Sequence, residues 1–304
     1  MRRAPVMGRG APASEAPPDA ALCRSAFDEL SGAVAKAAEV VRARPAGLVA
    51  DFDGTLSPIV ATPEEAFLLP EARAALRRLA RRLELVAVVS GRRADEVRRL
   101  VGLRRLVYLG NHGLERWEGG RQTGRAAVRP WRAALTAAMA DLRRGLAGLP
   151  GLRIEDKGVS FSVHYRGAPN HGAARAAALA AAWRVAAPCG LSVREAKKVV
   201  EVGPPSWPGK AAALAELASQ FQLRSLVCLG DDLPDLEAFR RLADLGGRGV
   251  ATLAIAVDGP EAPSELKEAA DLVLGGPEQV ARFLTALDTA LAAAGRGRFA
   301  RGMS

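Results

Sequence analysis

Four polar clusters are candidates for chemistry, because each directly follows a short apolar run. The first is Asp51 and Asp53, after the apolar residues 47–50. The other three, in chain order, contain Ser90, then Asn111 and His112, then Asp231, Asp232 and Asp235. An isolated D-x-D pair often does no more than cap a turn. Polar residues at the carboxyl ends of several parallel strands share one edge of a sheet, however, so we expect the four clusters to meet in one crevice.

The number of carboxylates in that crevice predicts a bound cation. Up to five of them would repel one another and raise their pKa values. A divalent cation with oxygen ligands removes this repulsion, and Mg²⁺ is favoured because it also binds phosphate oxygens. Ser90 and Lys210, which lies just upstream of the last cluster, could hold the other oxygens of a phosphoryl group. One aspartate could then form an aspartyl-phosphate, while a second protonates the leaving oxygen and later deprotonates water.

The elements that position these clusters predict an α/β fold with a Rossmann-like parallel sheet. Strands are expected at residues 47–50, 85–89, 106–109, 225–229, 253–257 and 272–274, and helices at 20–42, 71–82, 94–101, 211–221 and 277–293. The intervening segment predicts helices at 130–149 and 172–187 and antiparallel strands at 151–155, 159–166 and within 191–202. We therefore expect a core at residues 19–115 and 203–294, with an α+β unit at 116–202 inserted between its halves. Residues 1–18 are expected to be disordered and 295–304 to form a flexible tail.

Composition and charge exclude several other classes of protein. The chain has 304 residues, of which 49% are hydrophobic and 25% charged, as is usual for a soluble globular protein. No apolar run is long enough to span a bilayer, and no signal-peptide core follows the N-terminal M-R-R-A-P. The three scattered cysteines, Cys23, Cys189 and Cys228, fit reduced thiols better than a disulfide framework or a zinc site. We expect a cytoplasmic protein without a membrane partner.

The formal net charge of +10 raises the question of nucleic-acid binding. Only six of the 43 basic residues are lysine, and the arginines occur in scattered pairs that suit solvated helix faces. No basic stretch is interleaved with aromatic residues, which make up 5% of the chain. We expect no nucleic-acid partner; that alternative predicts salt-sensitive retention on DNA. A positive surface would equally attract an anionic phosphorylated substrate.

Taken in order, the motifs D-x-D-G-T, S-G-R, P-G-K and G-D-D-x-x-D resemble those of the haloacid-dehalogenase-like (HAD) phosphohydrolases. More narrowly, the chain resembles the trehalose-6-phosphate phosphatases, on the longer motifs D-F-D-G-T-L-S-P-I-V, G-N-H-G-L-E, E-D-K-G-V-S-F-S-V-H-Y-R and G-D-D-x-x-D-x-E-A-F. The similarity covers residues 47–290. It implies a HAD core with an inserted α+β cap domain, and Mg²⁺-dependent hydrolysis of trehalose 6-phosphate to trehalose and phosphate. It also implies a functional link to trehalose-6-phosphate synthase.

The resemblance also assigns roles to single residues. Asp51 would be the nucleophile and Asp53 the general acid/base, with Ser90 and Lys210 on the phosphate. Mg²⁺ would be bound by Asp51, the backbone carbonyl of Asp53 and Asp231, with Asp232 or Asp235 in support. The cap would close over the site, exclude water and bind the disaccharide hydroxyls through Glu155, Lys157, Arg166, Lys197 and Glu201. Arg92 and His112, at strand ends, would contact the rim of the site.

Two alternatives remain open within this resemblance. The substrate could be another sugar or glycoside phosphate, or the chain could be a catalytically impaired domain that senses a sugar phosphate. Pro234 and Leu236 replace a threonine and a glutamate that are common in the family, but the neighbouring aspartates are retained, so metal binding is expected to survive. Retention of Asp51 and Asp53 argues against an impaired domain.

The remaining polar and aromatic residues receive structural interpretations. His164 and His171 are interpreted as strand or surface histidines rather than metal ligands. Trp117 and Trp207 are expected to pack at the junction of core and cap, and Cys228 to be buried in a strand.

Overall fold

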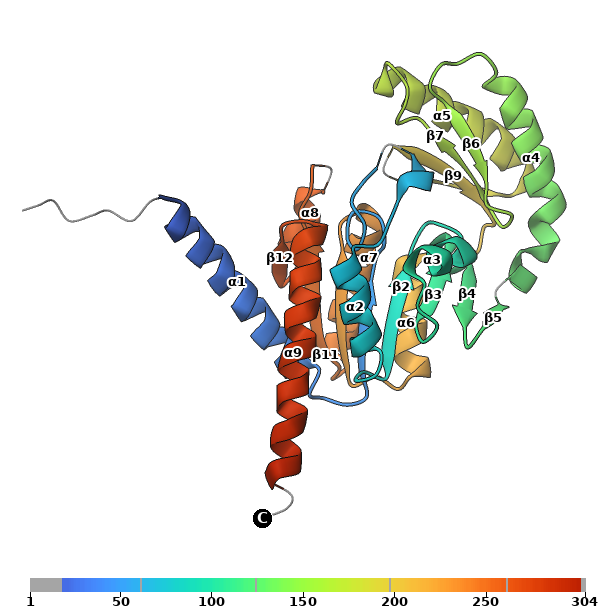
Figure 1. Cartoon of the computed structure of the whole chain (residues 1–304). Helices are drawn as coiled ribbons and strands as arrows, with labels where there is room; N and C mark the ends of the chain where they lie inside the picture. The colour runs from blue at the N-terminus through green and yellow to red at the C-terminus, as the bar shows by residue number, and fades with distance from the viewer. Residues whose placement is uncertain (1–17, 61, 124, 197, 261, 302–304) are drawn as a thin grey trace, which may run out of the picture.

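The computed structural model describes residues 18–60, 62–123, 125–196, 198–260 and 262–301. An eight-stranded sheet covered by helices on both faces forms the larger unit, and a four-stranded sheet with two helices forms the smaller one (Figure 1). The predicted α/β class with a parallel sheet is confirmed. No helix in the described ranges is both long enough and apolar enough to cross a bilayer.

The large sheet has the strand order β12-β11-β10-β1-β2-β3-β4-β5. Its parallel strands are β1 (Ala46–Ala50), β2 (Leu85–Val89), β3 (Val107–Gly110), β10 (Ser225–Gly230), β11 (Ala251–Val257) and β12 (Leu272–Leu274). β1 lies between β2 and β10, so the chain winds outward from β1 in one direction before the insertion and from β10 in the other direction after it. A ligand crevice is expected outside the carboxyl ends of the strands at such a switch point.

Helices cover both faces of this sheet, which explains why β1, β2, β3 and β10 are buried along their whole length. On one face lie α1 (Pro18–Val40), α2 (Pro70–Leu79), α3 (Ala94–Val101) and α9 (Pro277–Arg301). On the other lie α6 (Gly209–Gln220), α7 (Leu233–Gly246) and α8 (Ser264–Glu268). Asp288 of α9 is buried between two arginines of the α2 region, 2.5 Å from Arg78 Nε and 2.7 Å from Arg82 Nε.

The smaller unit contains α4 (Arg132–Gly145), α5 (His171–Ala186) and an antiparallel sheet of order β6-β7-β9-β8. The strands are β6 (Arg153–Asp156), β7 (Phe161–His164), β8 (Ser192–Ala196) and β9 (Val199–Gly203). Leu142, Val163, Ala182 and Val202 belong to its apolar core, between the helices and one face of the sheet. The other face carries charged residues and is turned toward the large sheet.

Helices α7 and α8 were not predicted from the sequence, and two further predictions differ from the structure. β4 (Glu115–Glu118) and β5 (Arg121–Thr123) form an antiparallel hairpin that pairs with β3, so they extend the core sheet although the predicted insertion begins at residue 116. We therefore propose a boundary after β5 for the cap. The last helix extends to Arg301 rather than ending near residue 293. A glycine costs a helix about 1 kcal/mol relative to alanine, which weakens it without ending it. The prediction for residues 1–17 lies outside the described residues.

Candidate active site

Four neighbouring strands deliver the predicted polar clusters to one edge of the sheet. In the order β10, β1, β2, β3, their carboxyl ends are followed by Asp231, Asp51, Ser90 and Asn111. The backbone N–H of Asp51 donates to the carbonyl of Leu229 on β10 at 3.0 Å, which joins the two halves of the sheet at the crevice. The clusters are therefore brought together although residues 51 and 231 are far apart in the sequence.

Lys210, at the start of α6, lies at the centre of the carboxylates. Its Nζ is 3.1 Å from Asp51 Oδ2, 3.1 Å from Asp232 Oδ1 and 2.9 Å from both carboxylate oxygens of Asp235. The lysine side chain is 3% exposed, so these charges face one another with little water between them. Burial alone would lower the pKa of Lys210, but the three carboxylates raise it, so the ammonium is held in its charged form.

Backbone geometry and one hydroxyl orient Asp231. Thr55 Oγ1 donates to Asp231 Oδ1 at 3.0 Å. Gly54 has φ +88°, and a Cβ at this position would lie 2.1 Å from Asp231 Oδ2. Glycine is therefore required here both for the turn and for the close approach of the carboxylate.

Asp51, Asp231 and Asp235 fit a divalent cation. All three are buried, and each offers a carboxylate oxygen within 4.8 Å of the others. Burial, reinforced by neighbouring carboxylates, raises the pKa of Asp51 and of Asp235 well above the ordinary value. Asp232 differs: burial acts in the same direction, but Lys210 lowers its pKa to about 2. Carboxylates with raised pKa values gain most from a cation, and an all-oxygen donor set suits Mg²⁺.

Asp53 lies apart from this acidic group. Its two carboxylate oxygens accept hydrogen bonds from Arg92, at 2.7 Å from Nε and 2.8 Å from Nη2. Arg92 also donates to Glu96 and, at 2.9 Å, to the carbonyl of Pro63. Burial would lower the pKa of Arg92, but the bond and charge of Asp53 raise it. Arg92 thus orients Asp53.

A cavity of about 340 Å³ lies between the two units and connects these groups. From the core it is lined by residues that include Asp51, Asp53, Ser90, Arg92, His112, Lys210 and Asp232. From the smaller unit it is lined by Glu155, Lys157, His164, Arg166 and Glu201, among others. Four of the five predicted sugar-binding residues therefore share one cavity with the predicted phosphate site; the fifth, Lys197, lies outside the described residues.

Lys157 and Glu201 of the smaller unit are docked on the core. Lys157 Nζ lies 2.8 Å from Glu201 Oε1 and donates to the carbonyl of Gly91 at 2.7 Å. Glu201 Oε2 lies 2.8 Å from His112 Nε2. Burial would raise the pKa of Glu201, but the charge of Lys157 lowers it well below the ordinary value. His112 is buried with φ +53°, a left-handed conformation that is uncommon for a residue with a side chain and is often found at functional sites.

Glu155 faces the cavity and pairs with His164 across β6 and β7. His164 Nε2 lies 2.7 Å from Glu155 Oε2. Burial would raise the pKa of Glu155, but the hydrogen bond from His164 and the charge of Lys157 lower it from 4.5 to about 2. His164 was interpreted from the sequence as a strand or surface histidine. In the structure it lines the cavity and contacts Glu155, which is predicted to bind the sugar.

This pair makes a testable contribution to acid stability. The folded-state pKa of Glu155 lies below its unfolded value, so the stabilisation is present above about pH 4.5 and is lost as the pH falls toward 2. The difference in unfolding temperature between the wild type and Glu155→Gln should be largest above about pH 5 and shrink below it. His164→Gln, which removes the same pair, should behave alike. A difference that stays constant with pH would contradict this assignment.

Comparison with known proteins identifies the family. The trehalose-phosphatase family model matches residues 49–272. A trehalose-phosphate phosphatase of Mycobacterium tuberculosis is 35% identical over 245 residues, which are 74% of this chain and 61% of that protein. The chain belongs to the trehalose-phosphatase family. It spans 61% of the length of this curated relative.

Solved structures share the fold of this trehalose-phosphatase family member. The C-terminal domain of a C. albicans trehalose-6-phosphate phosphatase has a TM-score of 0.69 and 21% identity, over 86% of this chain and 96% of that one. The C-terminal domain of a Candida albicans trehalose synthase regulatory protein has a TM-score of 0.58 and 12% identity, over 80% and 93%. At these identities the likeness shows the fold alone.

The replacements at Pro234 and Leu236 are accommodated in this trehalose-phosphatase fold. Asp232 caps α7 and Asp235 completes the capping box. Pro234 lies in the first turn, where a helix needs no backbone donor. Leu236 is buried among the apolar residues under α7. Neither replacement displaces Asp235, whose Oδ2 accepts from the N–H groups of Asp231 at 3.1 Å and Asp232 at 3.2 Å.

Three residues to which the sequence analysis assigned no role support the site. Thr55 holds Asp231, as described above. Asn111 accepts from Ser160 of the cap at Oδ1 (3.1 Å) and donates to Glu115 Oε2 (3.0 Å), and all three are buried. Thr55 and Asn111 were visible as parts of D-G-T and G-N-H, but Glu115 carried no local signal. Trp207 packs as predicted, with its Nε1 donating to the carbonyl of Asn111 at 2.8 Å, and Cys228 is buried in β10.

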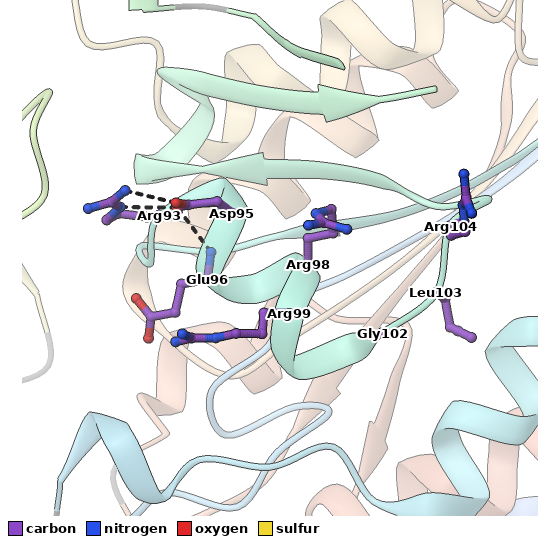
Figure 2. Close-up of a pocket in the computed structure, with 8 residues that line it drawn as sticks. All are labelled: Arg93, Asp95, Glu96, Arg98, Arg99, Gly102, Leu103 and Arg104. Atoms are coloured by element: carbon purple, nitrogen blue, oxygen red, sulfur yellow. Dashed lines mark hydrogen bonds and ion pairs between the residues drawn. The ribbon is translucent and has the colours of Figure 1, made fainter. Parts of the chain in front are cut away.

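A wider depression of about 630 Å³ lies along α3, outside this cleft. Figure 2 shows that its side chains spread along one helix and the following loop, and that Arg93 is paired with Asp95. Asp51, Asp231 and Asp235, the carboxylates that fit a divalent cation, do not line this depression. The cleft between the units is therefore the candidate active site.

Proposed function

We propose that the protein hydrolyses trehalose 6-phosphate to trehalose and phosphate through an aspartyl-phosphate on Asp51, with Mg²⁺ as cofactor. The observation that supports this most directly is the single cavity in which a buried Asp51–Lys210 pair faces Glu155, Arg166 and the cap. The end of the cavity at Asp51 and Lys210 suits a phosphoryl group. The end at Glu155 and Arg166 offers charged hydrogen-bonding groups for sugar hydroxyls. Membership of the trehalose-phosphatase family supports the same substrate.

The residues of the chain divide the reaction between them. The Asp51 carboxylate attacks phosphorus, while Lys210 and Ser90 hold the nonbridging oxygens. Asp53 protonates the leaving sugar oxygen and then takes a proton from water. Two hydrogen bonds from Arg92 hold the Asp53 carboxyl in its place at the cleft.

Asp51, Asp231 and Asp235 would hold the Mg²⁺ together with the backbone carbonyl of Asp53. When bound, the cation neutralises negative charge on the phosphoryl oxygens. Asp232 lies close to the ligands but faces Lys210 and caps α7. We place the reaction in the cytoplasm, in sequence with the synthase that makes the substrate.

A substrate panel with and without Mg²⁺ tests the proposal. Phosphate release should be greatest with trehalose 6-phosphate, weaker with sucrose 6-phosphate and glucose 6-phosphate, and absent after chelation. A preference for another glycoside phosphate would contradict trehalose 6-phosphate as the substrate but would still support the proposed phosphatase chemistry. Absence of turnover on every ester would favour the alternative, a non-catalytic sensing domain. The C-terminal domain of the Candida albicans trehalose synthase regulatory protein has a similar fold.

Glu155 should separate recognition of the sugar from chemistry. Its carboxylate faces the cavity and contacts His164 of the same cap sheet. We expect Glu155→Ala to lower kcat/KM for trehalose 6-phosphate about 10–100-fold, the loss expected from one buried charged hydrogen bond of about 1.5–3 kcal/mol. Hydrolysis of p-nitrophenyl phosphate should change far less. Equal losses on both esters would mean that Glu155 does not contact the sugar.

A further inference from the structure

One peptide group joins the cap to the phosphate end of the cleft. The carbonyl oxygen of Gly91 accepts a hydrogen bond from Lys157 Nζ at 2.7 Å, across the interface between the two units. The N–H of the same peptide belongs to Arg92 and donates to Ser90 Oγ at 3.1 Å. Because a peptide group is planar, its two ends cannot turn independently. The orientation that Lys157 selects at the oxygen is therefore the one in which the N–H meets Ser90.

A buried network holds Lys157 in place for this contact. The side chains of Lys157 and Glu201 are 6% and 4% exposed, and Glu201 is itself held by His112 of the core. Ser162 Oγ also donates to Glu201 Oε1, at 3.3 Å. A charged donor shielded from water makes a stronger hydrogen bond to a carbonyl than a neutral or exposed one. The contact with Gly91 is thus a defined feature of the docked cap.

The loop that carries Ser90 is also held from the core side. A Cβ at Gly91 would lie 2.8 Å from His112 Nε2, so the loop backbone is packed directly against the imidazole. The N–H of His112 donates to the carbonyl of Ser90 at 3.0 Å. With the core fixing one side of the loop, Lys157 is the cap's contribution to its conformation.

We propose that Lys157 is a positioning residue for the phosphate, beyond its proposed contact with the sugar. Docking of the cap orients the Gly91–Arg92 peptide, and this peptide orients the hydroxyl of Ser90 toward the phosphoryl oxygens. The inference rests on the proposed function, which assigns Ser90 to the phosphate. Closure of the cap and tightening of the phosphate site are then a single event, so that phosphate is bound most firmly when the cap is docked.

The test uses ligands without a sugar. We expect Lys157→Met to weaken binding of inorganic phosphate to the Mg²⁺-loaded chain about tenfold or more, measured by calorimetry. It should lower kcat/KM for p-nitrophenyl phosphate about 10–100-fold, because a displacement of about 1 Å in a positioned group can cost about 10²-fold. Lys157→Arg, which can still donate to Gly91, should recover part of both losses. Lys36→Met, which removes an exposed lysine paired with Asp271, is the matched control and should change neither.

A double variant separates positioning from stability. Lys157→Met alone leaves Glu201 without its buried cation, so Lys157→Met combined with Glu201→Gln is measured as well, together with thermal unfolding of each variant. Weak phosphate binding in whichever variant unfolds like the wild type supports the proposal. Unchanged phosphate affinity in such a variant, with losses confined to the sugar phosphate, overturns it. A wild type that fails to hydrolyse trehalose 6-phosphate overturns the proposed substrate instead, and the comparison of phosphate affinities still stands.

Discussion

Replacement of Asp51 by asparagine will reduce phosphate release from trehalose 6-phosphate by about 10⁵-fold or more, the scale of loss when a hydrolase loses its nucleophile. The amide has the shape of the carboxylate but cannot form the aspartyl-phosphate. The protein should not be destabilised, because burial and the neighbouring carboxylates already disfavour the charge on Asp51. Release of inorganic phosphate at saturating Mg²⁺ measures the first effect, and thermal unfolding measures the second.

Asp53→Asn is the comparison variant, because it distinguishes loss of the general acid/base from loss of the nucleophile. General acid–base catalysis contributes about 10²–10⁴-fold, so this variant should retain more activity than Asp51→Asn. It also removes the bidentate partner of Arg92. If Asp53→Asn proved the more damaging of the two, the assignment of the nucleophile would be wrong.

Lys210→Met should remove activity and also lower stability. Lys210 is the buried cation that three carboxylates face, so its loss leaves Asp51, Asp232 and Asp235 to repel one another. Breaking a buried ion pair by removing one partner costs about 3–5 kcal/mol, and we expect a decrease of that size in the free energy of unfolding. Mg²⁺ should restore part of it, because a cation that binds only the folded state stabilises that state.

An exposed lysine provides the matched control for this second prediction. Lys267 lies 2.6 Å from Asp258, and their side chains are 39% and 43% exposed. Lys267→Met should change stability by no more than about 0.5 kcal/mol and leave activity intact. Denaturant unfolding of both variants, with and without Mg²⁺, makes the comparison. Equal stabilities for the two variants would show that Lys210 is not the neutralising centre of the site.

The fold class and the convergence of the carboxylates in the candidate site could be predicted from local sequence. A buried strand followed at once by Asp51, by Ser90 or by Asp231 is a signal contained within a few residues, and parallel strands place their carboxyl ends on one edge by necessity. The hairpin β4–β5 shows the limit of such signals. Gly119 and Gly120 mark a turn, but only the pairing of Tyr108 with Trp117 decides that the hairpin joins the core sheet.

Side-chain partners within the site depended on the tertiary structure. Arg92 and Asp53 are 39 positions apart, and Lys157 and Gly91 are 66 positions apart, so no local pattern indicates either contact. His164 illustrates the same point, because it took a structural interpretation from its strand and proved to line the cavity beside Glu155. The sequence by itself determined which residues could do the chemistry and which strand ends carry them. Only the docking of the cap on the core decided which charges meet, because burial and distance, rather than residue type, set the strength of each electrostatic contact.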